Sequence, residues 1–310
     1  MLGISGIFLG LKAGEGPEKE LKPDGKGIGT LQHPPMPEQA KGNPGAKPEG
    51  PGKPTTNNGI TYHGGPVMTN TTHIYYIWYG DWTGDTATSL LPYLATNIGD
   101  SPYYKINTTY TNGAGVPVSA NVTYGGSAAV STIRPYATSL SDAQIRQIVL
   151  DSMVSKNPLP SDEDGVYFVL TSADVTASSG FCTKYCGWHT YSTMTVGGSN
   201  KVIKYSFVGN PARCLSACAA QTTSPNNNPG ADAMASIIAH ELEEAATDPQ
   251  LNAWYDSRGY ENADKCAWTF GTTYPIVANG SYANMKLGAL DFLIQRNWVN
   301  AGGGFCASSY

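Results

Sequence analysis

The sequence predicts an α+β fold in which a mixed β-sheet packs with helices and disulfides staple the later part of the chain. Runs rich in β-branched and aromatic residues indicate buried strands, and segments with apolar residues three and four apart indicate helices. These patterns follow one another as strand, helix, helix, strand, strand, helix, an order typical of α+β or mixed-sheet domains. All six cysteines lie in the loop-rich part of the chain after position 181.

The first 58 residues differ in composition from the rest. From about residue 12 to residue 58 the chain is dominated by Pro, Gly, Lys and Glu and has almost no aromatic or β-branched residues. Such a segment buries too little apolar surface to offset the entropy lost on ordering, so we predict a disordered arm over residues 1–58. The apolar run at its start resembles part of a secretion signal but has no preceding basic residue. A single folded domain is predicted over residues 59–310.

The first elements of this domain follow from local pattern. Residues 72–79 are aromatic and β-branched with almost no polar break, which predicts a central strand buried on both faces. Residues 86–98 carry leucines at helical spacing and predict a helix, although Pro92 interrupts it. The Asn-, Thr- and Gly-rich residues 103–124 predict a hairpin.

The middle of the domain continues the mixed order. Ser141 and Gln144 have the spacing of a capping box, and the apolar stripe after them predicts a helix. VYFVLT at residues 166–171 and KVIKYSFVGN at residues 201–210 predict two more strands, with a polar loop after the first. A turn-rich loop over residues 226–229 then leads to the segment that carries the candidate chemistry.

Residues 232–249 predict an amphipathic central helix with a buried face. Asp232 is placed to cap its first free N–H groups, and Pro249 ends it. His240 and Glu244 are four apart and therefore project side by side, while Glu241 lies between them in sequence. A zincin-like helix has this layout: it carries two metal ligands one turn apart, and an adjacent glutamate takes a proton from metal-bound water.

A catalytic zinc needs a third protein ligand and an open position for water. ENADKC downstream offers Glu261 and Asp264, which are three apart and face one point if the segment is helical. We therefore assign the metal to His240, Glu244 and one of Glu261 and Asp264, and the role of general base to Glu241. One imidazole among carboxylates is a harder ligand set than two imidazoles, so calcium or manganese is an alternative to zinc.

A plainer interpretation of the same helix stays open. An acidic run is usually a solvated face, to which we assign Glu243, and a single histidine on a helix is more often structural than a ligand. Against this, an unpaired imidazole on the side of Ile237 is costly to bury. His189, in CGWH, is either the missing nitrogen ligand or a hydrogen-bonding group in a stapled loop. Asp248 and Asp256 are further candidates for the third ligand.

Composition narrows the remaining possibilities. Two C-x3-C pairs and two single cysteines predict three disulfides and an oxidising compartment, in preference to a zinc ribbon with its usual shorter spacing. A net charge of -5 gives no basic field for nucleic acid. No segment reaches the roughly 20 apolar residues of a membrane span. Serine-hydrolase and phosphate-binding loop motifs are absent from the sequence.

Several ordered motifs resemble the exordium/phosphate-induced protein family. They are YHGGPV, IWYGDW, VLTSADV, GFCTKYCGWH, AHELEEAATDP with NAWYD, and ENADKC, and they span residues 60–306. This family is secreted and best known from plant cell walls, with bacterial and fungal members. The resemblance therefore implies an extracellular or wall-associated protein linked, in plants, to growth signalling.

Two functions follow from these observations. The first is a secreted, metal-dependent peptidase or amidohydrolase built on the zincin-like helix. The second is a non-enzymatic extracellular or cell-wall-associated binding protein in which the acidic residues form a structural ion site. The expected partner is a peptide or a cell-wall glycan, and neither nucleic acid nor a membrane is expected.

Overall fold

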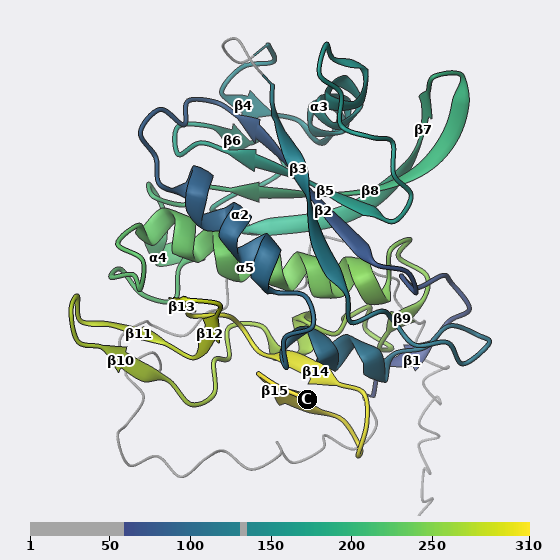
Figure 1. Ribbon diagram of the computed structural model, residues 1–310, viewed down its shortest axis with the longest axis vertical. Coiled ribbons are helices and arrows are strands. Elements are labelled where there is room, and N and C mark those ends of the chain that lie inside the picture. The colour runs from purple at the N-terminus through teal and green to yellow at the C-terminus, as the bar shows by residue number, and fades with distance from the viewer. Residues whose placement is uncertain (1–58, 131–134) are drawn as a thin grey trace, which may run out of the picture.

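The computed structural model describes residues 59–130 and 135–310, and a five-stranded mixed sheet forms its centre (Figure 1). The strand order is β3-β2-β5-β8-β7. Strands β3, β2, β5 and β8 run parallel, and β7 pairs antiparallel with β8. The bounds are β2 (Thr72–Tyr79), β3 (Val122–Ala129), β5 (Gly165–Thr171), β7 (Gly187–Val196) and β8 (Ser199–Gly209). The mixed sheet is confirmed, whereas the predicted arm over residues 1–58 lies outside the described residues.

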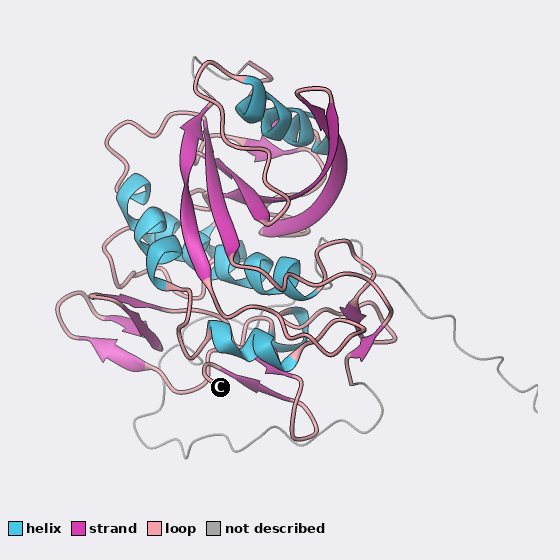
Figure 2. Ribbon diagram, turned by 45° about the vertical axis from the view of Figure 1, so that its right-hand side comes forward, coloured by secondary structure: helices cyan, strands magenta, loops and turns pink. Residues whose placement is uncertain are grey.

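Helices cover both faces of the sheet (Figure 2). On one face α5 (Pro229–Thr247) packs on β5, β7 and β8, and α2 (Ala87–Asn97) packs on β3 and on α5. On the other face α3 (Asp142–Val154) packs on β2, β5, β7 and β8. Because α5 lies between the sheet and the C-terminal part of the chain, it is buried along almost its whole length (Figure 1).

Three predicted elements are confirmed, and the burial or capping that predicted each one is present. Strand β2 is buried on both faces, with only His73 partly exposed, and it lies inside the sheet between β3 and β5. Helix α2 forms in spite of Pro92 and buries its leucine stripe. Helix α3 begins at a capping box, in which Ser141 Oγ accepts the Gln144 N–H and the Gln144 side chain accepts the Ser141 N–H.

The C-terminal part of the chain consists of short antiparallel ribbons below α5, shown in yellow-green and yellow in Figure 1. Two further short pairs lie elsewhere, β1 with β9 and β4 with β6. The remaining bounds are β1 (Thr61–Tyr62), η1 (Tyr104–Thr109), β4 (Ser139–Leu140), β6 (Thr176–Ala177), α4 (Leu215–Cys218), β9 (Trp254–Tyr255), η2 (Asp264–Cys266), β10 (Tyr274–Ile276), β11 (Ser281–Ala283), β12 (Met285–Leu287), β13 (Leu290–Phe292), β14 (Asn297–Val299) and β15 (Phe305–Ala307).

All six cysteines are paired, as predicted. The disulfides are Cys182–Cys214, Cys186–Cys218 and Cys266–Cys306. The first two join the segment before β7 to the segment around α4, and the third joins η2 to β15. A thiolate zinc site is therefore excluded, because no cysteine is free.

The predicted hairpin over residues 103–124 is confirmed only at its centre, where an antiparallel bridge joins Thr111 and Pro117. The rest of the segment contains the 3-10 helix η1 and then enters β3, which runs parallel to β2. Parallel neighbours need a crossover, and α2 with η1 provides it. The Asn, Thr and Gly residues of this segment correctly predict irregular backbone, but they do not determine which strand the segment pairs with afterwards.

The start of helix α5 needs correction, and one strand of the sheet was missed. Helix α5 begins at Pro229, three residues before Asp232, and its cap is Asn228, whose side chain accepts the Ala231 N–H. Asp232 instead accepts hydrogen bonds from the backbone and side chain of Asn226. Strand β7 was not predicted, because its first residues belong to a cysteine-rich segment without clear alternation.

Candidate metal centre

Helix α5 brings His240, Glu241 and Glu244 into the interior. The three side chains are 7%, 4% and 0% exposed. Their burial follows from the position of α5 between the sheet and the C-terminal ribbons, and not from an apolar face alone. Charged groups at such depth need partners, because desolvation penalises the ionised form.

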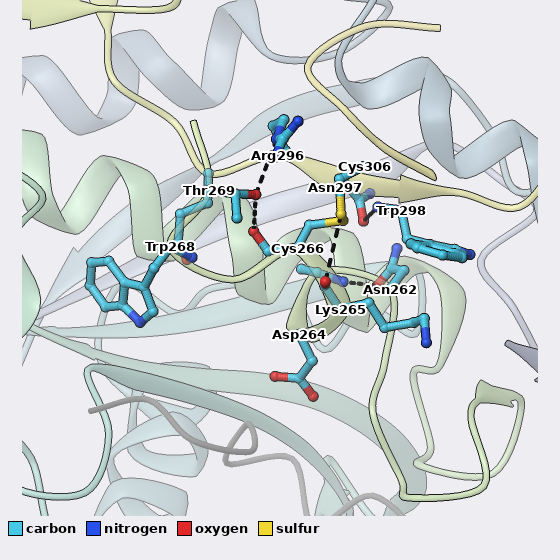
Figure 3. The surroundings of a disulfide bond; sticks show 12 residues. Asn262, Asp264, Lys265, Cys266, Trp268, Thr269, Arg296, Asn297, Trp298 and Cys306 are labelled. Carbon is cyan, nitrogen blue, oxygen red and sulfur yellow. Dashed lines mark hydrogen bonds between the residues drawn. A yellow bond between two sulfur atoms is a disulfide. The ribbon is translucent and has the colours of Figure 1, made fainter. Parts of the chain in front are cut away.

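An outer group forms around His240. Its Nε2 lies 3.0 Å from Glu244 Oε1 and 3.7 Å from Asp264 Oδ1. Asp264 opens η2, and its backbone N–H donates to Glu244 Oε1 at 3.0 Å. The Cys266–Cys306 disulfide lies two residues further along, and Figure 3 shows the Asp264 side chain projecting away from it. The predicted proximity of His240, Glu244 and the ENAD segment is present in the structure.

An inner group forms around His189 on β7. Alternation along the strand sets its direction: Trp188 stacks on Phe207 on one face, so His189, opposite Ser206, points to the α5 face. His189 Nδ1 lies 3.4 Å from carboxylate oxygens of both Glu241 and Glu244. The sequence left the role of His189 open, and it is strand β7 that brings this residue to the helix.

Glu261 belongs to the inner group and not to the outer one. Its Oε1 lies 3.5 Å from His189 Nε2, and both side chains are 1% exposed. The four predicted metal ligands are thus divided, with Asp264 beside His240, Glu261 beside His189, and Glu244 touching both histidines.

The residues fit a divalent cation. In each of two sets, His240 with Glu244 and Asp264, and His189 with Glu244 and Glu261, one candidate ligand atom per residue lies within 4.8 Å of the others. Bonds of 2.0–2.1 Å in a tetrahedral zinc site place ligand atoms about 3.3 Å apart, close to the contacts seen here. Several of these buried atoms have no hydrogen-bond partner: both nitrogens of His189, His240 Nδ1, Glu241 Oε2, Glu244 Oε2 and Glu261 Oε1. Such atoms are costly unless something binds them.

The carboxylates differ in proton affinity. Burial raises the pKa of Glu241 to about 7, against the opposing effect of His189. Burial also raises the pKa of Asp264, to about 6, with the Glu244 charge adding to it. Glu244 is equally buried, but its contacts with His240 and His189 outweigh this and lower its pKa to about 2. Glu244 is therefore the permanent anion of the cluster, and Glu241 is poised between base and acid near neutral pH.

The neighbouring acidic residues have other roles. Glu243 was assigned to solvent, which is wrong: it is fully buried and accepts a short hydrogen bond from the Asn297 side chain. Asp248 accepts the backbone N–H groups of Asn252 and Ala253 just after the helix. Asp256 pairs with Lys265 at 3.1 Å.

A small pocket borders the outer group. Its walls include Gly187, Ile237, His240, Glu241 and Asp264. The cavity volume of about 20 Å³ is room for about one water molecule. A Cβ on Gly187 would lie 2.5 Å from Ile237 Cγ2 and 3.0 Å from Glu241 Oε1, so the close approach of β7 to α5 requires glycine.

A second pocket adjoins the first along α5. Ala233 and Ser236 line it, Ile237 and His240 line the first, and Trp268 lines both. The four helix residues recur three or four apart, so a single strip of α5 faces both pockets. The outer group therefore lies at one end of a row of two small pockets along the helix.

Comparison with known proteins identifies the family. Residues 60–287 match the family model described as the phosphate-induced protein 1 conserved region. The chain belongs to the phosphate-induced protein 1 family. It is 30% identical to protein EXORDIUM-like 3 of Arabidopsis thaliana over 254 residues, which are 74% of this chain and 73% of that protein.

Two further relatives are more distant. Protein EXORDIUM-like 5 of Arabidopsis thaliana is 28% identical, over 69% of this chain and 65% of its own length. Protein PHOSPHATE-INDUCED 1 of Nicotiana tabacum is 25% identical, over 74% and 79%. No solved structure matches the chain. In the described residues, none of the helices combines the length and apolarity needed to cross a bilayer. Three disulfides are consistent with an extracellular protein.

Proposed function

We propose that this protein is a secreted, metal-dependent hydrolase that cleaves a peptide or another amide. His240, Glu244 and Asp264 would hold the cation, with Glu241 beside it. The observation that carries the proposal is that the His240 imidazole converges with the Glu244 and Asp264 carboxylates, and that His240 and Asp264 line a pocket together with Glu241. Zinc is the leading candidate, and the carboxylate-rich ligand set leaves manganese and calcium as alternatives.

The chemistry divides between the cation and the chain. A bound divalent cation would acidify a water molecule and polarise the substrate carbonyl. Glu241 would accept the proton of the attacking water and return it to the departing amine, because it lines the same pocket as His240 and Asp264. Asp264 is held in place by its backbone hydrogen bond to Glu244 and by the nearby disulfide. Water is largely excluded, which strengthens each electrostatic interaction.

The row of two pockets along α5 is the position that we propose for an extended substrate. It is lined by the helix strip, by Trp268, and by both cysteines of the Cys186–Cys218 disulfide, which divide between the two pockets. A peptide lying along it would contact small and apolar side chains from Ala233 to Ile237 and reach Glu241 with one carbonyl.

Metal analysis combined with an activity screen tests this proposal. Purified full-length protein should carry bound divalent cation and cleave members of a peptide library, and chelation should abolish cleavage. Glu241→Gln should keep the cation and lose cleavage, because it removes only the proton acceptor. Absence of bound metal from the intact protein after exposure to zinc, manganese and calcium would overturn the proposal.

A second candidate function rests on the depth of the cluster. Glu244 is 0% exposed and the adjoining cavity has room for about one water molecule, which also suits a structural ion site in a non-enzymatic wall-associated binding protein. In that case chelation would lower the melting temperature while no peptide is cleaved. Binding to cell-wall glycans on an array would favour this function.

A further inference from the structure

We propose that the cluster binds two divalent cations, with Glu244 as the bridge between them. The inner cation would be held by His189, Glu244 and Glu261, behind the outer cation of the proposed hydrolase. This inference rests on the proposed metal site and adds a second one to it.

The first argument is geometric. The two carboxylate oxygens of Glu244 face different histidines: Oε1 lies 3.0 Å from His240 Nε2, and Oε2 lies 3.4 Å from His189 Nδ1. A carboxylate that offers one oxygen to each of two ligand sets is suited to bridge two cations, which lie about 3.5–4 Å apart in known two-metal sites. Each set has a histidine and a second carboxylate of its own.

The second argument comes from atoms without partners. Both nitrogens of His189 are buried and make no hydrogen bond, although each lies within 3.5 Å of a carboxylate oxygen. Glu261 Oε1 and Glu244 Oε2 are likewise buried without a hydrogen-bond partner. An outer cation alone would leave these inner atoms without a hydrogen bond or a bond to metal. An inner cation would take one nitrogen of His189, and the other, as N–H, would donate to the remaining carboxylate.

The third argument is the charge balance. Glu241, Glu244, Glu261 and Asp264 carry four negative charges when ionised, and histidines that bind metal are neutral. Even with His189 protonated, one divalent cation leaves one of those charges uncompensated in the interior, whereas two cations balance all four. Within the described residues, the ion pairs of these four carboxylates are with histidines only. Lys265, which follows Asp264 in the sequence, pairs with Asp256.

The two positions differ in access. Of the inner ligands, His189 and Glu261 are 1% exposed and Glu244 is 0% exposed, and none lines the pocket that borders His240 and Asp264. The outer cation would therefore be reached through the pocket, whereas the inner one would be released only when β7 or the ENAD segment moves. We expect a chelator to remove the cations in two phases of clearly different rate.

Metal stoichiometry and electron paramagnetic resonance of the manganese-loaded protein test the inference. We expect two metal ions per chain in the wild type, about one in Glu261→Gln and in His240→Gln, and an exchange-coupled signal in the wild type only. His63→Gln is the matched control, because His63 stacks on Tyr255 outside the cluster and should leave two ions bound. Circular dichroism identifies any variant that fails to fold. The number of metal ions bound per wild-type chain tests the inference even if a variant does not fold.

The outcomes separate this inference from the proposed function. One ion per chain in the wild type, lost in His240→Gln but kept in Glu261→Gln, would refute the inner site and leave the hydrolase proposal standing. Two ions that persist in Glu261→Gln and in His189→Gln would place the second ion elsewhere and also refute it. No bound ion would refute both proposals.

Discussion

Glu244 is in contact with both histidines of the cluster and with the backbone of Asp264. It is fully buried, yet its pKa is lowered to about 2 because the imidazoles outweigh the effect of burial. If Glu244 were neutralised, both histidines would lose the anion that they share. At the scale of single residues, the fold has therefore placed one permanent charge in its interior and arranged the other ionisable groups around it.

Glu241→Gln is the sharpest single-residue test of catalysis. The amide keeps the size of the side chain but cannot accept a proton, so we expect hydrolysis to fall by roughly 10²–10⁴-fold. Bound metal and melting temperature should change little, as measured by elemental analysis and calorimetry. Glu163→Gln, in the exposed turn before β5 and beside Lys201, is the control and should leave the rate unchanged. Equal rates for wild type and Glu241→Gln would remove Glu241 from the mechanism.

A pH-dependent contribution to stability is expected at Asp162, far from the cluster in sequence. Partial burial opposes its ionisation, but hydrogen bonds from His73, the Asp164 N–H and Tyr75 hold its pKa below the usual range. A lowered folded-state pKa gives stability that is present above the unfolded pKa, about 3.9, and lost as pH falls through the folded value.

Asp162→Asn should therefore lower the melting temperature at pH 7 and make progressively less difference below about pH 4. Thermal unfolding of both proteins between pH 2.5 and 7 measures this. Asp100→Asn removes an exposed pair with Lys105 and should have little effect at any pH. A constant difference between Asp162→Asn and wild type across the range would contradict the expectation.

At the scale of elements, the cluster depends on three segments meeting: helix α5, strand β7 and the turn at η2. The helix supplies three side chains from one sequence motif, so its spacing alone predicted His240, Glu241 and Glu244 as neighbours. His189 could not be assigned in that way, because its position depends on the pairing of β7 with β8. The same limit applies to Glu261 and Asp264, whose separation into two groups follows from the path of the turn.

Gly187→Ala tests the contact between β7 and α5. The added methyl group would overlap Ile237 Cγ2 and press on Glu241, so β7 must shift. We expect a loss of about 1–3 kcal/mol in the free energy of unfolding and weaker metal binding, measured by denaturant titration and isothermal calorimetry. Gly59→Ala is the control, since a Cβ there meets nothing within 4 Å. If Gly187→Ala is destabilised but binds metal as tightly as the wild type, the packing of β7 on α5 does not determine the geometry of the metal site.

Removing the Cys266–Cys306 disulfide tests how the turn is held. The two cysteines are 40 residues apart, and loss of such a bridge typically costs about 2–5 kcal/mol. A double serine variant should unfold at lower temperature and bind the outer cation more weakly, because Asp264 lies two residues from Cys266. Differential scanning calorimetry and metal titration measure the two effects. If metal affinity stays unchanged, the bridge does not position Asp264.

At the scale of the whole molecule, the sheet and its helices bring together residues more than 70 positions apart in sequence, from His189 to Asp264. Local pattern predicted the buried strand β2, helices α2 and α3 and the three disulfides, because each depends on short-range spacing or on cysteine count. It did not predict β7, the crossover through η1, or the burial of Glu243. Those features depend on which segments pack against each other, and Glu243 is buried because β14 covers its side of α5.

Crystals grown with zinc or manganese and measured across the metal absorption edge test the central claim most directly. We expect an anomalous difference peak about 2.0–2.2 Å from His240 Nε2 and from a carboxylate oxygen of Glu244, and a second peak on the His189 side of Glu244. Crystals without any peak at His240, with both imidazoles hydrogen-bonded directly to the carboxylates, would contradict it.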